Sequence, residues 1–267
     1  RANYGTIFRE GDNSTQFFDM LNDQNSHLLK VGLDVYLNDK NTLSVFTSQN
    51  SFKGAPGGNI NIVYADDMSR NLMQDFGADM DNYSQQYNFD YKLDFEKEGH
   101  NIEFEADYNT FDADEDTFFD FTGATPLADY EDFVDTKRDR TTMNLDYVNP
   151  LSESEKLEVG VQAILFNTDI GYSSTGQSYN ATGNLVPTPN TLFDYSRDIY
   201  SAYVTYGKNY EKWSYQAGVR AEQVNVVADT NSVRAFTNDY FELYPSAYVT
   251  FNPSEKNQYQ VSYSRRI

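Results

Sequence analysis

The chain has 267 residues and carries 41 acidic against 20 basic side chains, which gives a formal net charge of −21. This charge excludes a partner that is held through its phosphates, such as a nucleic acid. The lack of cysteine excludes disulfide bonds and thiolate metal sites, while 22 tyrosines and 19 phenylalanines argue against a disordered chain.

Ten stretches along the chain carry the side-chain pattern of β-strands. In residues 87–95 (YNFDYKLDF), apolar side chains take every second position and polar ones fill the positions between them. Such a period of two puts one kind of side chain on each face of a strand. The predicted strands are 27–37, 42–50, 83–95, 101–111, 140–148, 156–168, 196–207, 212–227, 240–251 and 257–265. We therefore predict an all-β protein.

The connections between these strands alternate strictly between short and long. The short ones are rich in residues that form hairpin turns, and they are 37–41, 96–100, 149–155, 208–211 and 252–257. The long ones are 51–82, 112–139, 169–195 and 228–239. In an antiparallel sheet this alternation gathers all short turns at one end. Together with strands of about ten residues, it is typical of a transmembrane β-barrel, because strands of soluble proteins usually have about 5–6 residues.

The period of two also predicts which side chains meet lipid and which meet water. Aromatic residues near the short turns, such as Tyr147, Trp213 and Phe251, are typical of the belt at a membrane surface. We expect the lipid-facing side chains to include Tyr91, Leu93, Phe104, Val161 and Val219. We expect the lumen-facing side chains to include Lys92, Asp94, Glu103, Glu105, Arg220 and Glu222. The alternative is a soluble all-β surface adhesin, whose apolar face would cover a protein core.

The connection at residues 112–136 is predicted to be an acidic extracellular loop. It holds nine Asp and Glu residues and no Lys or Arg. Asp112, Asp114 and Asp116 have the D-x-D-x-D spacing that begins many calcium loops, so they are candidate ligands for Ca²⁺. A complete EF-hand pattern is absent, because Thr117 stands where that loop needs glycine. The alternative is a solvated loop without a bound ion.

The C-terminal stretch FELYPSAYVTFNPSEKNQYQVSYSRRI (241–267) resembles the barrels of TonB-dependent outer-membrane transporters of Bacteroidota-type bacteria. The matching elements are Tyr244-Pro245-Ser246, Tyr248, Lys256-Asn257, Gln260 and the closing Tyr263-Ser264-Arg265-Arg266-Ile267. The pattern DYKLDF, turn, IEFEADY at 90–108 is similar to the same family.

This resemblance implies an integral outer-membrane protein for the energy-coupled uptake of a scarce small-molecule, peptide or glycan ligand. Its implied partners are outer-membrane lipid, TonB acting through a plug domain, and a surface lipoprotein lid. Such transporters have barrels of about 22 strands, so we expect residues 1–267 to be a section of about ten strands, with the plug and the C-terminal strands outside it.

The chain contains no G-x-S-x-G, H-E-x-x-H or glycine-rich phosphate motif. We therefore expect no enzyme activity and no required cofactor, with Ca²⁺ as a candidate bound ion. The remaining alternative within the outer membrane is a passive porin, or a barrel scaffold that serves adhesion or secretion.

Overall fold

The structure is a computed structural model that describes residues 2–9, 13–125 and 128–265. Eleven strands form one antiparallel sheet: β1 (Ala2–Arg9), β2 (Ser14–Asn38), β3 (Asn41–Tyr64), β4 (Leu72–Asp94), β5 (Asn101–Gly123), β6 (Tyr130–Pro150), β7 (Glu155–Ser174), β10 (Thr191–Asn209), β11 (Trp213–Thr230), β12 (Val233–Ser254) and β13 (Asn257–Ser264). A separate small hairpin, β8 (Gln177–Tyr179) and β9 (Leu185–Pro187), lies between β7 and β10.

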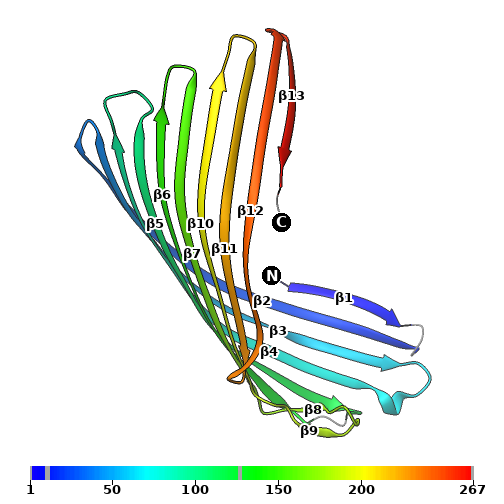
Figure 1. The fold of residues 1–267 in the computed structure, drawn as a ribbon. Coiled ribbons are helices and arrows are strands. Elements are labelled where there is room, and N and C mark those ends of the chain that lie inside the picture. The colour runs from blue at the N-terminus through cyan, green and yellow to red at the C-terminus, as the bar shows by residue number, and fades with distance from the viewer. Residues whose placement is uncertain (1, 10–12, 126–127, 266–267) are drawn as a thin grey trace.

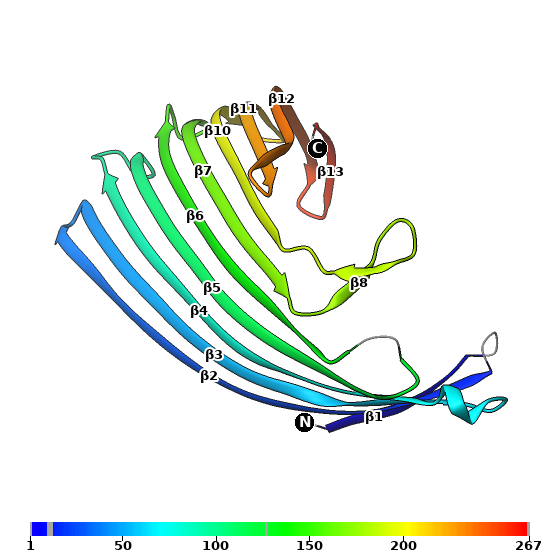
Figure 2. The same cartoon turned by 90° about the horizontal axis from the view of Figure 1, so that it is seen from below.

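Each strand of the large sheet pairs with the strands next to it in the chain, apart from the excursion through β8 and β9 (Figure 1). The sheet curves into an open trough, and within the described residues β1 and β13 form its two edges (Figure 2). A short 3₁₀ turn at Met68–Arg70 connects β3 to β4. None of the described residues forms a helix long and apolar enough to cross a membrane.

The ten predicted strands are all present and in the predicted order, which confirms the all-β, antiparallel fold. The five short turns lie together at one end of the sheet, at the top of Figure 1. The side-chain pattern did not predict β1 or the β8–β9 hairpin. The number of strands in the large sheet is therefore eleven rather than ten.

The prediction of long loops at the other end of the sheet is wrong for most of their residues. In the large sheet, the strands from β2 to β12 run for 18–25 residues. Residues 51–64 therefore belong to β3, and residues 112–123 belong to β5. Backbone pairing continues there, for example between Asp112 and Lys137. Polar outward side chains such as Asp112 and Asp114 interrupt the apolar series in these extensions. The sequence pattern that marks a half-buried strand therefore weakens before the strand itself ends.

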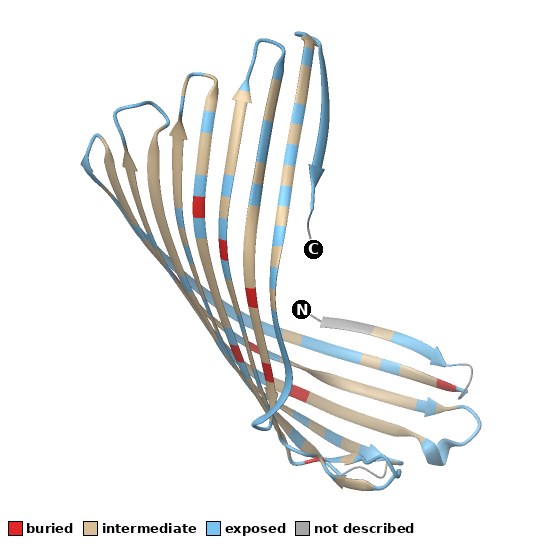
Figure 3. Ribbon diagram, in the orientation of Figure 1, coloured by how far each residue is buried: buried red, intermediate tan, exposed pale blue. Residues whose placement is uncertain are grey.

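Burial in this sheet is inverted relative to a soluble protein. Figure 3 shows that little of the sheet is buried. Val224 and Ala228 are the buried hydrophobic residues among those described, whereas Val161 is 49% exposed. The accessible surface is 17356 Å², compared with about 12,000 Å² expected for a soluble monomer of this mass. The described residues therefore form no core that could stabilise the fold in water, which argues against the soluble adhesin.

Candidate functional site

Cross-strand register separates the side chains of the sheet into one apolar and one polar face. On one face, Leu145 of β6 pairs with Phe104 of β5 and with Val161 of β7. On the other face, the preceding residue of β6, Asn144, pairs with Glu105 and Gln162. Because neighbouring strands stay in register over this region, the same separation runs across the sheet.

The apolar face has the height of a membrane. On β7, five successive outward positions are apolar, namely Leu157, Val159, Val161, Ala163 and Leu165. Nine residues at about 3.3 Å each, tilted by about 40°, give a band about 23 Å tall, close to the ~25 Å apolar band of outer-membrane barrels. Aspartates take outward positions just beyond this band, namely Asp81, Asp112, Asp139, Asp169, Asp198 and Asp239.

Aromatic rings gather at the end of the band next to the short turns. Trp213 stacks on Phe251 with ring centroids 4.2 Å apart, and Phe95 lies 4.2 Å from the ring of His100. Tyr147 meets His100 edge-on, and its hydroxyl oxygen lies 3.0 Å from His100 Nε2. Amphipathic rings in this position are what a membrane–water interface favours.

The polar face is joined by a hydrogen-bond network centred on Arg220 of β11. One Arg220 terminal nitrogen donates to Gln162 Oε1 at 2.6 Å and to Ser201 Oγ at 2.7 Å. Arg220 Nε donates to Glu222 Oε1 at 2.5 Å. The guanidinium therefore reaches across β10 and links β7 to β11, with its charge balanced by a carboxylate on its own strand.

The network continues toward the N-terminal strands through two side-chain amides. Gln162 Nε2 donates to Asn144 Oδ1 at 2.7 Å, and Asn144 Nδ2 donates to Glu105 Oε2 at 3.3 Å. One chain of hydrogen bonds thus crosses the polar face from β5 to β11. These side chains are half-buried because they crowd together on this face, whereas Val161 and Val219 on the opposite face are exposed.

The outer membrane protein beta-barrel family matches residues 93–267, from the end of β4 to the C-terminal end of the chain. This chain belongs to that family. The outer membrane barrel protein is therefore an integral membrane protein, which contradicts the soluble adhesin.

Solved structures similar to this outer membrane barrel protein include three receptors. The siderophore receptor PiuA of Acinetobacter baumannii is 12% identical with a TM-score of 0.47, and the match covers 98% of this chain and 46% of PiuA. The unliganded ferric citrate transporter FecA is 9% identical with a TM-score of 0.45, and the match covers 95% of this chain and 42% of FecA. The alcaligin receptor FauA of Bordetella pertussis is 12% identical with a TM-score of 0.48, and the match covers 94% of this chain and 43% of FauA.

This chain thus spans less than half the length of each of these receptors. No curated protein matches the sequence.

The six side chains predicted to face the lumen all belong to the polar face of the barrel protein. Lys92 lies opposite Glu103 across β4 and β5, and Glu105 is linked through the network to Arg220 and Glu222. Asp94 lies at the end of β4, opposite Asn101 and next to a short turn. That these side chains line a lumen stays a prediction.

Asp90, whose position in the alternating stretch 87–95 predicts the same face as Lys92, lies beside two of these predicted residues. Carboxylate oxygens of Asp90, Glu103 and Glu105 lie within 4.8 Å of one another. Such a set of oxygen atoms has the chemistry that Ca²⁺ or Mg²⁺ prefers. Asp90 pairs directly with Glu105. The period of two predicts the face of Asp90, but only the register of β4 and β5 shows that it lies next to Glu103 and Glu105.

The candidate calcium ligands Asp112, Asp114 and Asp116 lie in the extension of β5 rather than in a loop. They occupy alternate, exposed positions on the face that continues the apolar band, so about 6.6 Å of strand separates each from the next. Lys137 lies opposite Asp112, and Asp135 lies opposite Asp114. Binding of Ca²⁺ there stays a prediction.

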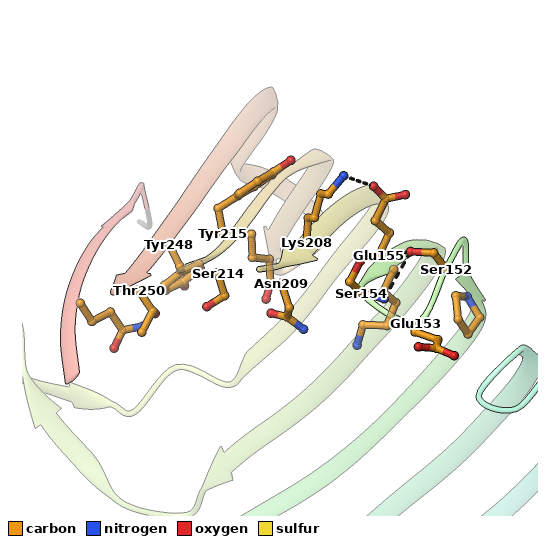
Figure 4. Close-up of a pocket in the computed structure, with 15 residues that line it drawn as sticks. Ser152, Glu153, Ser154, Glu155, Lys208, Asn209, Ser214, Tyr215, Tyr248 and Thr250 are labelled. Carbon is orange, nitrogen blue, oxygen red and sulfur yellow. Dashed lines mark hydrogen bonds and ion pairs between the residues drawn. The ribbon is translucent and has the colours of Figure 1, made fainter. Parts of the chain in front are cut away.

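A polar hollow lies on the same side of the sheet as the network, close to the short turns (Figure 4). Ser214, Tyr248 and Thr250 line it, and the Lys208–Glu155 ion pair lies at its edge. The hollow contains hydroxyl, amide and charged groups, and no histidine or cysteine is among its lining residues. These groups are the kind expected in a barrel wall that faces water.

Proposed function

We propose that this outer membrane barrel protein is part of a TonB-dependent transporter, which takes up a scarce solute at the expense of inner-membrane energy. The observation that carries the proposal is the continuous polar wall from Glu105 to Glu222 on the face opposite to the lipid. Charged, hydrogen-bonded side chains over five strands suit a wide lumen that holds water or a polar plug, whereas small barrels fill their interior with packed side chains.

Two further features support the proposal. The sheet curves gently and leaves its edges apart after eleven strands (Figure 2), which suits a barrel of considerably more strands. Open strand edges are not tolerated in lipid, so we propose that β1 and β13 pair with further strands of the same barrel. The C-terminal motif from Tyr244 to Ile267 resembles the transporter family.

The partners proposed with this function are TonB, a plug domain inside the barrel, a small-molecule, peptide or glycan ligand, and a surface lipoprotein lid. The paired ends of β5 and β6 support a role at the outer mouth. They extend beyond the apolar band, and the rings of Phe119 and Tyr130 stack there with centroids 4.7 Å apart. Aromatic platforms of this kind suit a ligand or a docked protein.

A passive porin is the second candidate, because a polar wall also suits an open channel. Uptake should be measured in a strain that lacks the full-length protein and in the complemented strain, with ferric siderophores, cobalamin, oligosaccharides and peptides as trial solutes. The transporter requires saturable uptake of one solute, lost upon TonB inactivation or addition of a protonophore.

Conductance in planar bilayers provides the second arm of this test. A plugged transporter gives no steady open channel. Steady conductance of the full-length protein, together with solute flux that survives the protonophore, would favour the porin and refute the transporter.

A further inference from the structure

In the part of the chain that the structure describes, three arginines on the polar face pair with no carboxylate, although the chain carries an excess of acids. Arg138, Arg140 and Arg197 form no ion pair among the described residues, whereas Arg70, Arg220, Arg234 and Arg265 each pair with Asp or Glu. All three guanidinium-bearing side chains are exposed.

These arginines share one small area of the sheet. Phe166 of β7 lies directly between Arg140 of β6 and Arg197 of β10. Arg138 is two residues from Arg140 and on the same face. With strands about 4.8 Å apart and about 6.6 Å between alternate residues, the three side chains project from an area roughly 10 Å across.

Aromatic rings line the same area. The guanidinium carbon of Arg138 lies 5.6 Å from the ring centre of Phe111, and that of Arg197 lies 5.8 Å from the ring centre of Phe166. Tyr195 meets Phe166 edge-on with ring centroids 6.0 Å apart. The rings hold Arg138 and Arg197 by cation–π contacts and leave the N–H groups of their planar forks available to another acceptor.

An apolar layer separates this area from the Arg220 network. Ile164, Ile199 and the buried Val224 lie opposite one another across β7, β10 and β11. The arginine layer lies on the far side of these residues from the short turns, level with the outward aspartates that end the apolar band. It therefore belongs to the outer, solvent-exposed part of the wall.

From this geometry we infer that Arg138, Arg140 and Arg197, with Phe111, Phe166 and Tyr195, bind an anionic ligand that carries carboxylate, phosphate or similar oxyanion groups beside a flat aromatic ring. The inference rests on the proposed function, because it assigns the substrate class of that transporter. Guanidinium groups bind such anions through paired N–H donors, and the rings offer stacking surfaces.

The test uses the full-length protein in detergent and 8-hydroxypyrene-1,3,6-trisulfonate, a fluorescent aromatic trianion, as the probe. Fluorescence anisotropy should show saturable binding that weakens with added salt. Arg140→Gln and Arg197→Gln should each weaken binding about tenfold, and the double variant about a hundredfold, as expected for lost charge-assisted hydrogen bonds. Lys137→Gln, an outward neighbour on β6, is the matched control and should bind like the wild type.

The inference is overturned if the wild type does not bind the probe, as would happen if a carboxylate elsewhere in the full-length protein occupies the arginines. It is also overturned if the double variant, with unchanged heat-modifiable gel mobility, binds as tightly as the wild type. Binding is measured without an energy source. A protein that binds the probe but imports nothing would refute the proposed transport alone, and a transporter that ignores the probe would refute this inference alone.

Discussion

Val161→Arg tests whether the apolar face meets lipid. Val161 is the third of five apolar outward positions on β7 and is 49% exposed, so it lies near the middle of the band. An arginine at mid-membrane should destabilise the folded barrel by about 2–4 kcal/mol. If that face met water, the same change at an exposed position would alter stability by only about 0.5 kcal/mol.

The assay is urea-dependent unfolding of the full-length protein in phosphatidylcholine vesicles, followed by tryptophan fluorescence and by heat-modifiable gel mobility. Asn88→Arg is the matched control, because Asn88 lies on the polar face and donates to Asp107 Oδ1 at 3.1 Å, a carboxylate that an arginine can also bind. We expect this control, and Glu105→Gln, to change stability by less than about 1 kcal/mol. Equal losses at Val161 and Asn88 would refute the assignment of faces.

Three further predictions concern the ends of the strands and the isolated chain. Deleting residues 113–134 should preserve barrel assembly and reduce uptake, because Asp112 and Lys137 already pair and a two-residue turn can join them. If uptake is unchanged and calcium does not alter proteolysis of residues 112–136, these residues form only a solvated segment, and the proposed role at the outer mouth is refuted. At the short turns, the hydrogen bond and charge of Lys40 lower the pKa of Glu96 below its usual 4.5. The stability that Lys40→Gln removes should therefore be present at neutral pH and disappear as the pH falls through that lowered pKa. Finally, residues 1–267 alone should not yield a soluble, cooperatively unfolding monomer, given the exposed apolar face, and sedimentation with denaturant titration would check this.

The sequence predicted the faces well because side-chain alternation depends only on the strand period. Glu105 and Val161 were assigned to opposite environments from their phase alone, and the register places them on opposite faces. The network was not predictable in the same way. The contact between Arg220 and Gln162 spans an intervening strand, so it requires the register of three strands, which turn geometry and pairing decide.

The length of the strands was the main error, and it has a physical cause. Within the band, lipid demands apolar outward side chains, so the pattern is strong. Beyond it, as at Asp114 and Asp116, water accepts any polar residue on the outward face while backbone pairing continues. Sequence patterns therefore mark where the membrane ends, and they do not mark where the strand ends.

Single-cysteine scanning along β7 tests the central claim most directly, because this chain has no cysteine of its own to interfere. Spin labels at residues 158–165 of the full-length protein in vesicles would be compared for collisions with oxygen, which concentrates in lipid, and with a water-soluble nickel chelate. We predict a period of two, with labels at Val159, Val161 and Ala163 favouring oxygen and labels at Glu158 and Gln162 favouring the chelate. Labels at Val161 and Gln162 that respond alike to both reagents would contradict a barrel wall with one lipid face and one water face.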